Sequence, residues 1–452
     1  MRPVAYRLAA PLAALVCFLS QSWLYGWGNH ALYENILRWY GVVPFRIPFV
    51  DISGSLAAWE CARQGVDVIL SDPCDVLHRG YNYSPLWMAA APIPLGVSDR
   101  VPVGWCLDLL FIASLGLLPP PRRPVELMIV LAATLSTMVV FALERANPDI
   151  LLFVLALMAG LLAVCRLPLR LLGYCLALVA ALLKYYPIMV LIIVFRERAS
   201  RFIATSIVIA GALAVFCVVY HGEIARGLPT ITRGPYNTDL FAAKNLPFLL
   251  GEVVGGVAGP WSWAPLVQPV FAGAVYATLV GICIVICLRL LGYGEFSSTL
   301  ASLSELERIF LATGSAVIVG CFFAGQSIGY RGVFLLMVIP GLLAISRVSN
   351  RHLRNLGVGT CVVIVLLMWG ECFRLVLASE GKILFWLIRE LGWWWAISVM
   401  LAVICNFIWE APIVRAMASD LHRWVVTHIP SSQQPGPGRT VNTANSTGGA
   451  PS

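Results

Sequence analysis

Long apolar runs recur along the whole chain, and short polar segments separate them. A helix needs about 20 mostly apolar residues to cross a bilayer. Some apolar runs have about this length, and shorter apolar runs lie between them. Together they are residues 8–25, 101–118, 124–143, 150–165, 171–183, 188–195, 202–220, 267–290, 307–324, 332–346, 355–377 and 390–409. They predict an all-α polytopic membrane protein with about twelve transmembrane helices. The last region could also be one long helix, or an interfacial piece followed by a span.

The composition supports a membrane class and excludes a soluble one. The chain is 59% hydrophobic and only 12% charged, whereas soluble domains carry about 25% charged residues. The formal net charge of +8 could suggest a nucleic-acid partner. The Lys and Arg residues lie in short loops between apolar runs, which is the positive-inside pattern, so we expect membrane lipids and no nucleic acid as partners.

The basic residues set the predicted orientation. Arg2 and Arg7 precede the first apolar run, which resembles an uncleaved signal anchor and puts the N-terminus in the cytoplasm. Residues 85–96 are apolar, but they are few and contain three prolines, so they predict an interfacial or re-entrant helix. If this segment spanned instead, several basic clusters would move to the outer side. We expect a multi-pass protein of the cell inner (plasma) membrane with both termini cytoplasmic.

This topology divides the chain into a membrane domain and a tail. The transmembrane domain covers residues 1–429, with exoplasmic loops at 26–100, which carries interfacial helices, and at 221–265. Residues 430–452 are rich in Ser, Gly, Pro, Thr and Asn and predict a disordered cytoplasmic tail. A strong internal repeat is not evident, which disfavours a transporter built from duplicated halves.

The 13 cysteines give little sign of metal or redox chemistry, since most lie in apolar runs and none forms a CxxC pair. We therefore assign no metal ligands. Cys61 and Cys74 differ, because both fall in the first exoplasmic loop. They could form a disulfide there or remain two free thiols.

Unusual polar residues gather at the predicted outer side. Asp51 follows an apolar run and precedes a predicted helix at 53–64, so it could be a helix cap or a general base near the membrane surface. His78 could be a ligand or proton donor, although a lone His is more often neither. Tyr83 precedes an apolar segment and could belong to the interfacial aromatic belt.

Two further outer positions carry charges between spans. Glu144 and Asp149 flank a turn; Asp149 could be a cap and Glu144 a solvated side chain, or both could face the same site as Asp51. Lys184 lies between two short apolar pieces and could snorkel or bind a lipid-linked phosphate.

The last candidates come from the second half of the chain. Arg331 follows a short outer loop and could contact phosphate, to which a guanidinium is suited, or stack on an aromatic ring. The segment Lys244–Phe248 adds a basic residue and Asn245 to the same side.

Together these motifs resemble the GT-C membrane glycosyltransferases, most closely glycosyltransferase family 87. The stretches that carry the resemblance are Asp51 in the first loop, Tyr83-Ser84-Pro85-Leu86, Asn147-Pro148-Asp149 and Lys184-Tyr185-Tyr186-Pro187, with residues 325–340 also similar. The resemblance covers roughly residues 1–350. Family members usually carry further aromatic and acidic residues beside the first-loop Asp, whereas Ser53, Gly54 and Ser55 follow it here.

The resemblance implies a GT-C-like bundle that transfers a sugar, such as mannose, from a polyprenyl-phosphate donor to a glycan or lipid acceptor. Asp51 would be the general base. Glu144 or Asp149 would lie near the sugars, and Lys184 and Arg331 would hold the phosphate. Some relatives use a divalent cation and others do not.

Two other classes of function remain open. A transporter or lipid flippase predicts polar residues near mid-membrane, whereas here they lie mainly at span ends. A non-catalytic membrane protein predicts that Asp51, Lys184 and Arg331 can be replaced without effect.

Overall fold

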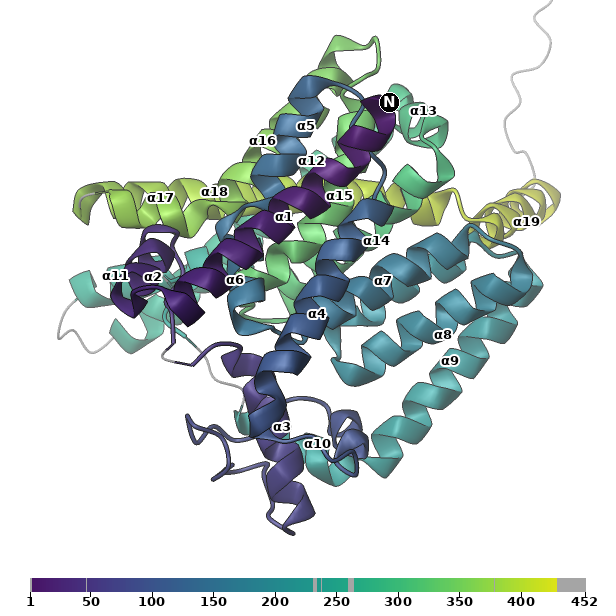
Figure 1. The fold of residues 1–452 in the computed structure, drawn as a ribbon. Helices are drawn as coiled ribbons and strands as arrows, with labels where there is room; N and C mark the ends of the chain where they lie inside the picture. The colour runs from purple at the N-terminus through teal and green to yellow at the C-terminus, as the bar shows by residue number, and fades with distance from the viewer. Residues whose placement is uncertain are drawn as a thin grey trace, which may run out of the picture.

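The computed structural model shows an α-helical bundle (Figure 1) and describes residues 2–45, 47–230, 234–236, 238–258, 264–377 and 379–428. The predicted tail at 430–452 and parts of the 221–265 loop lie outside the described residues. Within the described part, most of the backbone is helical, and an isolated bridge joins Phe241 to Ser327. The predicted all-α class is thus confirmed.

The first half of the chain begins with a long helix and an outer segment of short helices. Its elements are α1 (Arg2–Trp27), α2 (His30–Trp39), α3 (Val50–Arg63), η1 (Pro85–Ala90), η2 (Val97–Asp99), α4 (Arg100–Ser114), η3 (Leu115–Leu117), α5 (Pro124–Thr134), α6 (Thr137–Arg145), α7 (Asp149–Ala163), α8 (Leu167–Leu183), η4 (Tyr186–Arg196) and α9 (Ala199–Val219).

The second half contains most of the longest helices. Its elements are α10 (His221–Gly227), η5 (Leu228–Thr230), α11 (Asn245–Ala258), α12 (Ala264–Gly292), α13 (Gly294–Ser302), α14 (Glu305–Ala324), η6 (Gly329–Phe334), α15 (Leu335–Ile345), α16 (Arg351–Met368), α17 (Gly370–Val376), α18 (Ser379–Trp409) and α19 (Pro412–His428).

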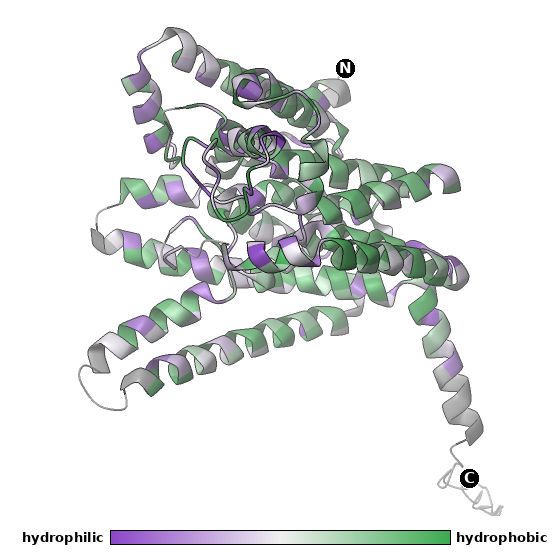
Figure 2. Cartoon of the chain, turned by 90° about the horizontal axis from the view of Figure 1, so that it is seen from below, coloured by the Kyte–Doolittle hydropathy of each residue, from purple (hydrophilic) through white to green (hydrophobic). Residues whose placement is uncertain are grey.

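Seven helical segments of the described chain are long and apolar enough to cross a membrane, and a bent pair, α5 with α6, adds an eighth. Hydrophobic residues run along most helices, and hydrophilic residues concentrate at their ends and in the connections (Figure 2). α9 and α12 bury little of their apolar surface inside the protein, which is expected where lipid is the neighbour. The chain is therefore a multi-pass membrane protein.

Four other apolar helical segments are shorter: α7, α8, η4 and η6 with α15. At a rise of 1.5 Å per residue, a 15-residue helix such as α7 extends only about 22 Å, less than the roughly 30 Å hydrocarbon core. All twelve predicted segments are helical, but these four are shorter than the other eight.

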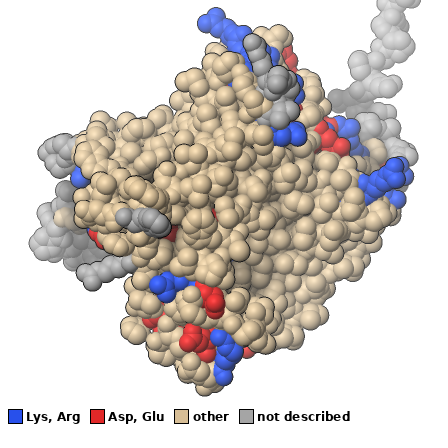
Figure 3. Space-filling model, in the orientation of Figure 1, with Lys and Arg blue, Asp and Glu red and all other residues tan. Residues whose placement is uncertain are grey.

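The predicted alternation of sides agrees with the ion pairs. Each ion pair of the described residues joins two side chains that the topology puts at the same end of the bundle, for example Arg347 with Glu126 and Glu307, or Arg79 with Asp51 and Asp75. In Figure 3 the charged side chains gather near α3 at the bottom and along the upper and right edges, with a broad uncharged surface between. We call the end with the Arg79, Asp51 and Asp75 ion pairs the α3 end, and the end with the Arg347, Glu126 and Glu307 ion pairs the Arg347 end.

Residues 85–96 do not span. Their only helix is η1, a 3₁₀ helix of 6 residues, which extends about 12 Å at 2.0 Å per residue. The Ser84 hydroxyl and the Trp87 indole N–H donate to the carbonyls of Leu182 and Leu183. These carbonyls belong to the last turn of α8, which has no intrahelical partners for them. The segment thus caps α8 directly before Lys184.

Candidate functional site

Asp51 lies in the first turn of α3, and its two carboxylate oxygens have different partners. Arg79 Nη1 lies 3.2 Å from Oδ1, and Asn147 Nδ2 donates to Oδ2 at 2.6 Å. The Asp75 carboxylate also pairs with Arg79, at 2.8 Å from Nε. Three segments, the start of α3, the loop before η1 and the turn between α6 and α7, therefore meet at one carboxylate.

Asp149 forms the second half of the cluster and is fully buried. Its backbone N–H donates to Asn147 Oδ1, so one Asn side chain contacts both acids. The Asp149 carboxylate is ion-paired with Lys184 and lies 3.5 Å from Arg331 Nε. Asp149 is at the N-terminus of α7 as predicted, but its side chain holds two cations from α8 and η6 rather than acting only as a cap.

Three tyrosines surround these charges. The Lys184 ammonium lies 5.1 Å from the ring centroid of Tyr83 and 5.7 Å from that of Tyr186. The Arg331 guanidinium lies 5.1 Å from the Tyr186 ring. Rings at this distance attract a cation and limit its movement, so Tyr83 contributes to the cluster and not only to an interfacial belt. Tyr330 approaches from η6 and packs on Phe141.

Backbone strain also gathers here. Three non-glycine residues of the described chain have positive φ: Phe49 (56°), His78 (51°) and Ala146 (42°). Each comes one or two residues before a member of the cluster, namely Asp51, Arg79 or Asn147. Such backbone costs of order 1–3 kcal/mol and tends to occur at functional sites. The strain supports a functional reading over simple helix capping.

The cations of the cluster are more exposed than its acids. The exposed fraction of the side chain is 40% for Arg79, 22% for Arg331 and 13% for Lys184, against 8% for Asp51 and 0% for Asp149. Burial lowers the pKa of Arg79, but its contacts with Asp75 and Asp51 outweigh this and raise the pKa, so it stays charged. A ligand that enters the site meets positive charge first.

Glu144 lies behind the cluster. Its carboxylate pairs with Arg145 at 2.7 Å, and its backbone carbonyl accepts the N–H of Phe49. Arg145 also donates to the carbonyl of Val43 and stacks over Phe45. The pair joins the end of α6 to the segment before α3, which positions Asp51. The structure therefore places Glu144 as a support rather than among the groups that bind Asp51 or Asp149 directly.

His78 and Asn245 are not brought into the cluster. The His78 side chain is exposed, and no described hydrogen bond or ion pair uses it; its strained backbone instead directs the next residue, Arg79. Asn245 is buried and donates to the carbonyl of Leu240. Its neighbours Phe241 and Ser327 exchange backbone hydrogen bonds, so Asn245 stabilises the loop that supports Arg331.

Three members were missed as candidates: Arg79, Asp75 and Asn147. Asn147 belongs to the Asn147-Pro148-Asp149 motif but was not chosen as a site residue, and Arg79 and Asp75 are common loop residues outside the motifs. Their contacts with Asp51 and with one another form only when the chain folds. The available signals were weak: Arg79 is adjacent to His78, and Asn147 stands before Pro148-Asp149 in the polar turn.

Gly54 leaves space for Arg79 beside Asp51. A Cβ at Gly54 would lie 2.7 Å from Arg79 Nη2, so the glycine gives the guanidinium room to reach Asp51. We expect Gly54→Ala to displace Arg79 and impair the site while changing the unfolding temperature little, because the obstructed atom ends a flexible side chain. Thermal unfolding and the transfer assay described below test this. A large loss of stability with unchanged activity would contradict it.

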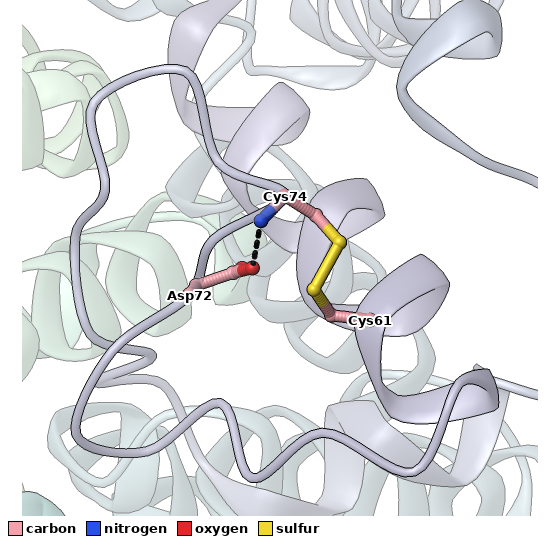
Figure 4. A group of neighbouring side chains, drawn as sticks. All are labelled: Cys61, Asp72 and Cys74. Atoms are coloured by element: carbon pink, nitrogen blue, oxygen red, sulfur yellow. Dashed lines mark hydrogen bonds between the residues drawn. A yellow bond between two sulfur atoms is a disulfide. The ribbon is translucent and has the colours of Figure 1, made fainter.

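The first loop is closed by a disulfide between Cys61 of α3 and Cys74, whose Cα atoms are 5.9 Å apart (Figure 4). Of the two alternatives for these cysteines, the structure shows the bonded one. Asp72 accepts the backbone N–H of Cys74, and burial raises the pKa of its carboxyl. Cys61, Asp72 and Cys74 lie close enough to hold a metal ion, but in the disulfide both sulfurs are used. The group therefore serves as a cross-link.

Counting thiols tests the disulfide directly. The chain has 13 cysteines, of which eleven are free in the structure. Denatured, unreduced protein should therefore bind eleven equivalents of an alkylating reagent, and reduced protein thirteen. Cys61→Ser should give twelve without reduction, because it releases the Cys74 thiol. Thirteen equivalents before reduction of the wild type would show that the loop is not cross-linked.

Searches against family models, curated proteins and solved structures return no match for this chain. The functional argument therefore depends on the chemistry of the site itself.

Proposed function

We propose that this protein is a membrane glycosyltransferase. It moves a sugar from a polyprenyl-phosphate donor to a glycan or lipid acceptor at the outer face of the inner membrane. Asp51 accepts the proton of the acceptor hydroxyl as the new bond to the sugar forms. The bond between the sugar and the phosphate oxygen breaks, and polyprenyl phosphate leaves.

The observation that carries this proposal is the arrangement of two partly exposed cations around one buried carboxylate. Lys184 and Arg331 share one carboxylate, Asp149, so the three groups together carry one net positive charge. Their residual exposure exceeds that of Asp149. Negative charge develops on a phosphate as it leaves, and preorganised cations stabilise that charge most in a site that excludes water. A guanidinium also matches the geometry of phosphate oxygens.

Asp51 is suited to act as a base on the acceptor. Each of its oxygens makes one hydrogen bond, and a carboxylate oxygen has two lone pairs, so each keeps acceptor capacity. Arg79 and Asn147 orient the carboxylate from opposite sides. The Asn147 link to Asp149 couples the position of the base to the position of the two phosphate-binding cations.

An apolar recess beside Tyr83 supports a lipid-linked donor. It lies between the first loop, Tyr185 and α10, and Asn82 and Glu223 are the polar residues at its edge. Its walls include Val68, Tyr81, Met88 and Leu228. An isoprenoid chain that begins there would have its phosphate near Lys184, whose ammonium lies 5.1 Å from the centroid of the Tyr83 ring.

The topology belongs to the same proposal. We infer that the twelve apolar segments alternate across the membrane, with the α3 end exoplasmic and the Arg347 end cytoplasmic. The Cys61–Cys74 disulfide supports this orientation, since disulfides persist in oxidising compartments. The resemblance leaves a divalent cation open, but Asp51 and Asp149 are both engaged by cationic or amide partners, so they do not fit a metal site without rearrangement.

A donor assay tests the proposal. Purified protein in bilayer nanodiscs, given a polyprenyl-phosphate hexose with a labelled sugar, should release polyprenyl phosphate in the presence of an acceptor glycan or lipid. Arg331→Gln should raise the donor KM more than tenfold, because the interaction with the phosphate is lost. Arg351→Gln, an exposed Arg at the Arg347 end, is the matched control. Equal donor KM values for the two variants would remove the phosphate site.

A further inference from the structure

A large cavity lies at the Arg347 end, far from the Asp51–Asp149 cluster. Its volume is about 290 Å³, and its walls come from η4, α13, α14 and the C-terminal part of α18. α14 begins at this cavity and runs about 30 Å, for 20 residues, to the loop before Arg331. The cavity therefore cannot be part of the proposed transfer site.

The charged side chains that line the cavity differ in whether they have an ion-pair partner. Arg196 pairs with Glu305, and Glu410 pairs with Arg415 just beyond the wall. Arg308 lines the same cavity, and within the described part of the chain it forms no ion pair; its Nε is buried without a hydrogen-bond partner. The Arg308 guanidinium thus has no carboxylate partner among the described residues, and a buried donor without a hydrogen bond is unfavourable.

The other walls are apolar. Phe195, Leu300, Val403 and Phe407 line the cavity, and Leu300 and Val403 are almost fully buried. Asn406 donates to Ser297 at 2.8 Å, which links α18 to α13 and holds these walls together. A guanidinium without an ion pair among the described residues therefore lies beside a surface that suits hydrocarbon.

We propose that this cavity binds one anionic phospholipid, with its phosphate on Arg308 and part of an acyl chain along the apolar walls. A guanidinium binds phosphate by directed hydrogen bonds, and basic pockets between membrane helices bind anionic headgroups. The same end of the bundle carries Arg166, Arg170, Arg198 and Arg201, whose charge attracts anionic lipid to the surface. The occupant is a membrane lipid rather than a soluble phosphate ester, because phosphate alone would leave the apolar walls unused.

Native mass spectrometry of the whole chain in detergent tests this inference with phosphatidylglycerol as the probe. The wild type should retain one phosphatidylglycerol at least ten times more strongly than phosphatidylcholine. Arg308→Gln should lower the affinity for phosphatidylglycerol at least tenfold, whereas Arg351→Gln should leave it unchanged. Ala301→Trp places a large side chain at the cavity without removing charge and should weaken binding similarly.

Several results would overturn the proposal. They are equal retention of the two lipids, unchanged binding by Arg308→Gln, and competition by glycerol 3-phosphate at the same concentration as the lipid. If Arg308→Gln does not fold, Ala301→Trp decides, and normal binding by that variant counts against the cavity. The Asp51→Asn variant should bind phosphatidylglycerol like the wild type, so failure of the transferase proposal and failure of the lipid site are distinguishable.

Discussion

Replacing Asp51 with Asn should lower the rate of sugar transfer by about 10²–10⁴-fold, the usual contribution of a general base. The change keeps the size of the side chain. Asn147 can still donate to an amide oxygen at position 51, and Arg79 keeps its 2.8 Å contact with Asp75. The expected loss is therefore chemical rather than structural, and it should appear in kcat with little change in the donor KM.

The control for this experiment is Asp67→Asn. Asp67 is an acid of the same loop, but it is exposed and pairs with Arg226 at the surface, where an ion pair contributes about 0–1 kcal/mol. This variant should transfer sugar at the wild-type rate. Full activity in Asp51→Asn, with wild-type membrane insertion, would eliminate Asp51 as the base and leave the cluster as a structural network.

Replacing Asp149 with Ala should destabilise the protein by about 3–5 kcal/mol, the usual cost of breaking a buried ion pair. Asp149 is fully buried, and its loss would leave Lys184 and Arg331 close together without an anion. The effect should appear as a lower thermal unfolding temperature in detergent. Adding Lys184→Met should recover part of the loss, because one uncompensated cation is then removed.

The matched control is Glu34→Ala, which breaks the exposed Glu34–Arg38 pair of α2 and should change the stability by no more than about 1 kcal/mol. If the stability loss of the double variant Asp149→Ala with Lys184→Met equals the sum of the losses of the two single variants, the two groups do not interact. That result would also weaken the phosphate site, which requires Asp149 to hold both cations in position.

The membrane architecture was predictable because its signal is local. A long apolar run predicts a membrane helix by itself, because a segment in lipid must form its backbone hydrogen bonds internally. Each of the twelve predicted segments is helical, and residues 85–96 form only a short 3₁₀ helix. The number of full spans was not predictable in the same way, because a helix such as α7, most of whose residues are buried among neighbouring helices, can be short.

The site was predictable in part. Asp51, Asp149, Lys184, Arg331 and Tyr83 were singled out because of their positions at span ends, and the structure brings all five together. Glu144 was placed near the sugars from its position in the same turn, but its side chain pairs with Arg145. Consecutive residues of a turn point in different directions, and only the tertiary packing decides which one faces the site.

The sequence by itself determined that this chain is a helical membrane protein and that its polar residues gather at span ends, because hydrophobic length and charge act locally. Only the tertiary structure decided which of those residues touch. Asn147 bridges Asp51 and Asp149, Arg79 reaches Asp51 past Gly54, and Cys61 bonds to Cys74. These contacts join segments that are separate in the chain, so their geometry depends on how the helices pack.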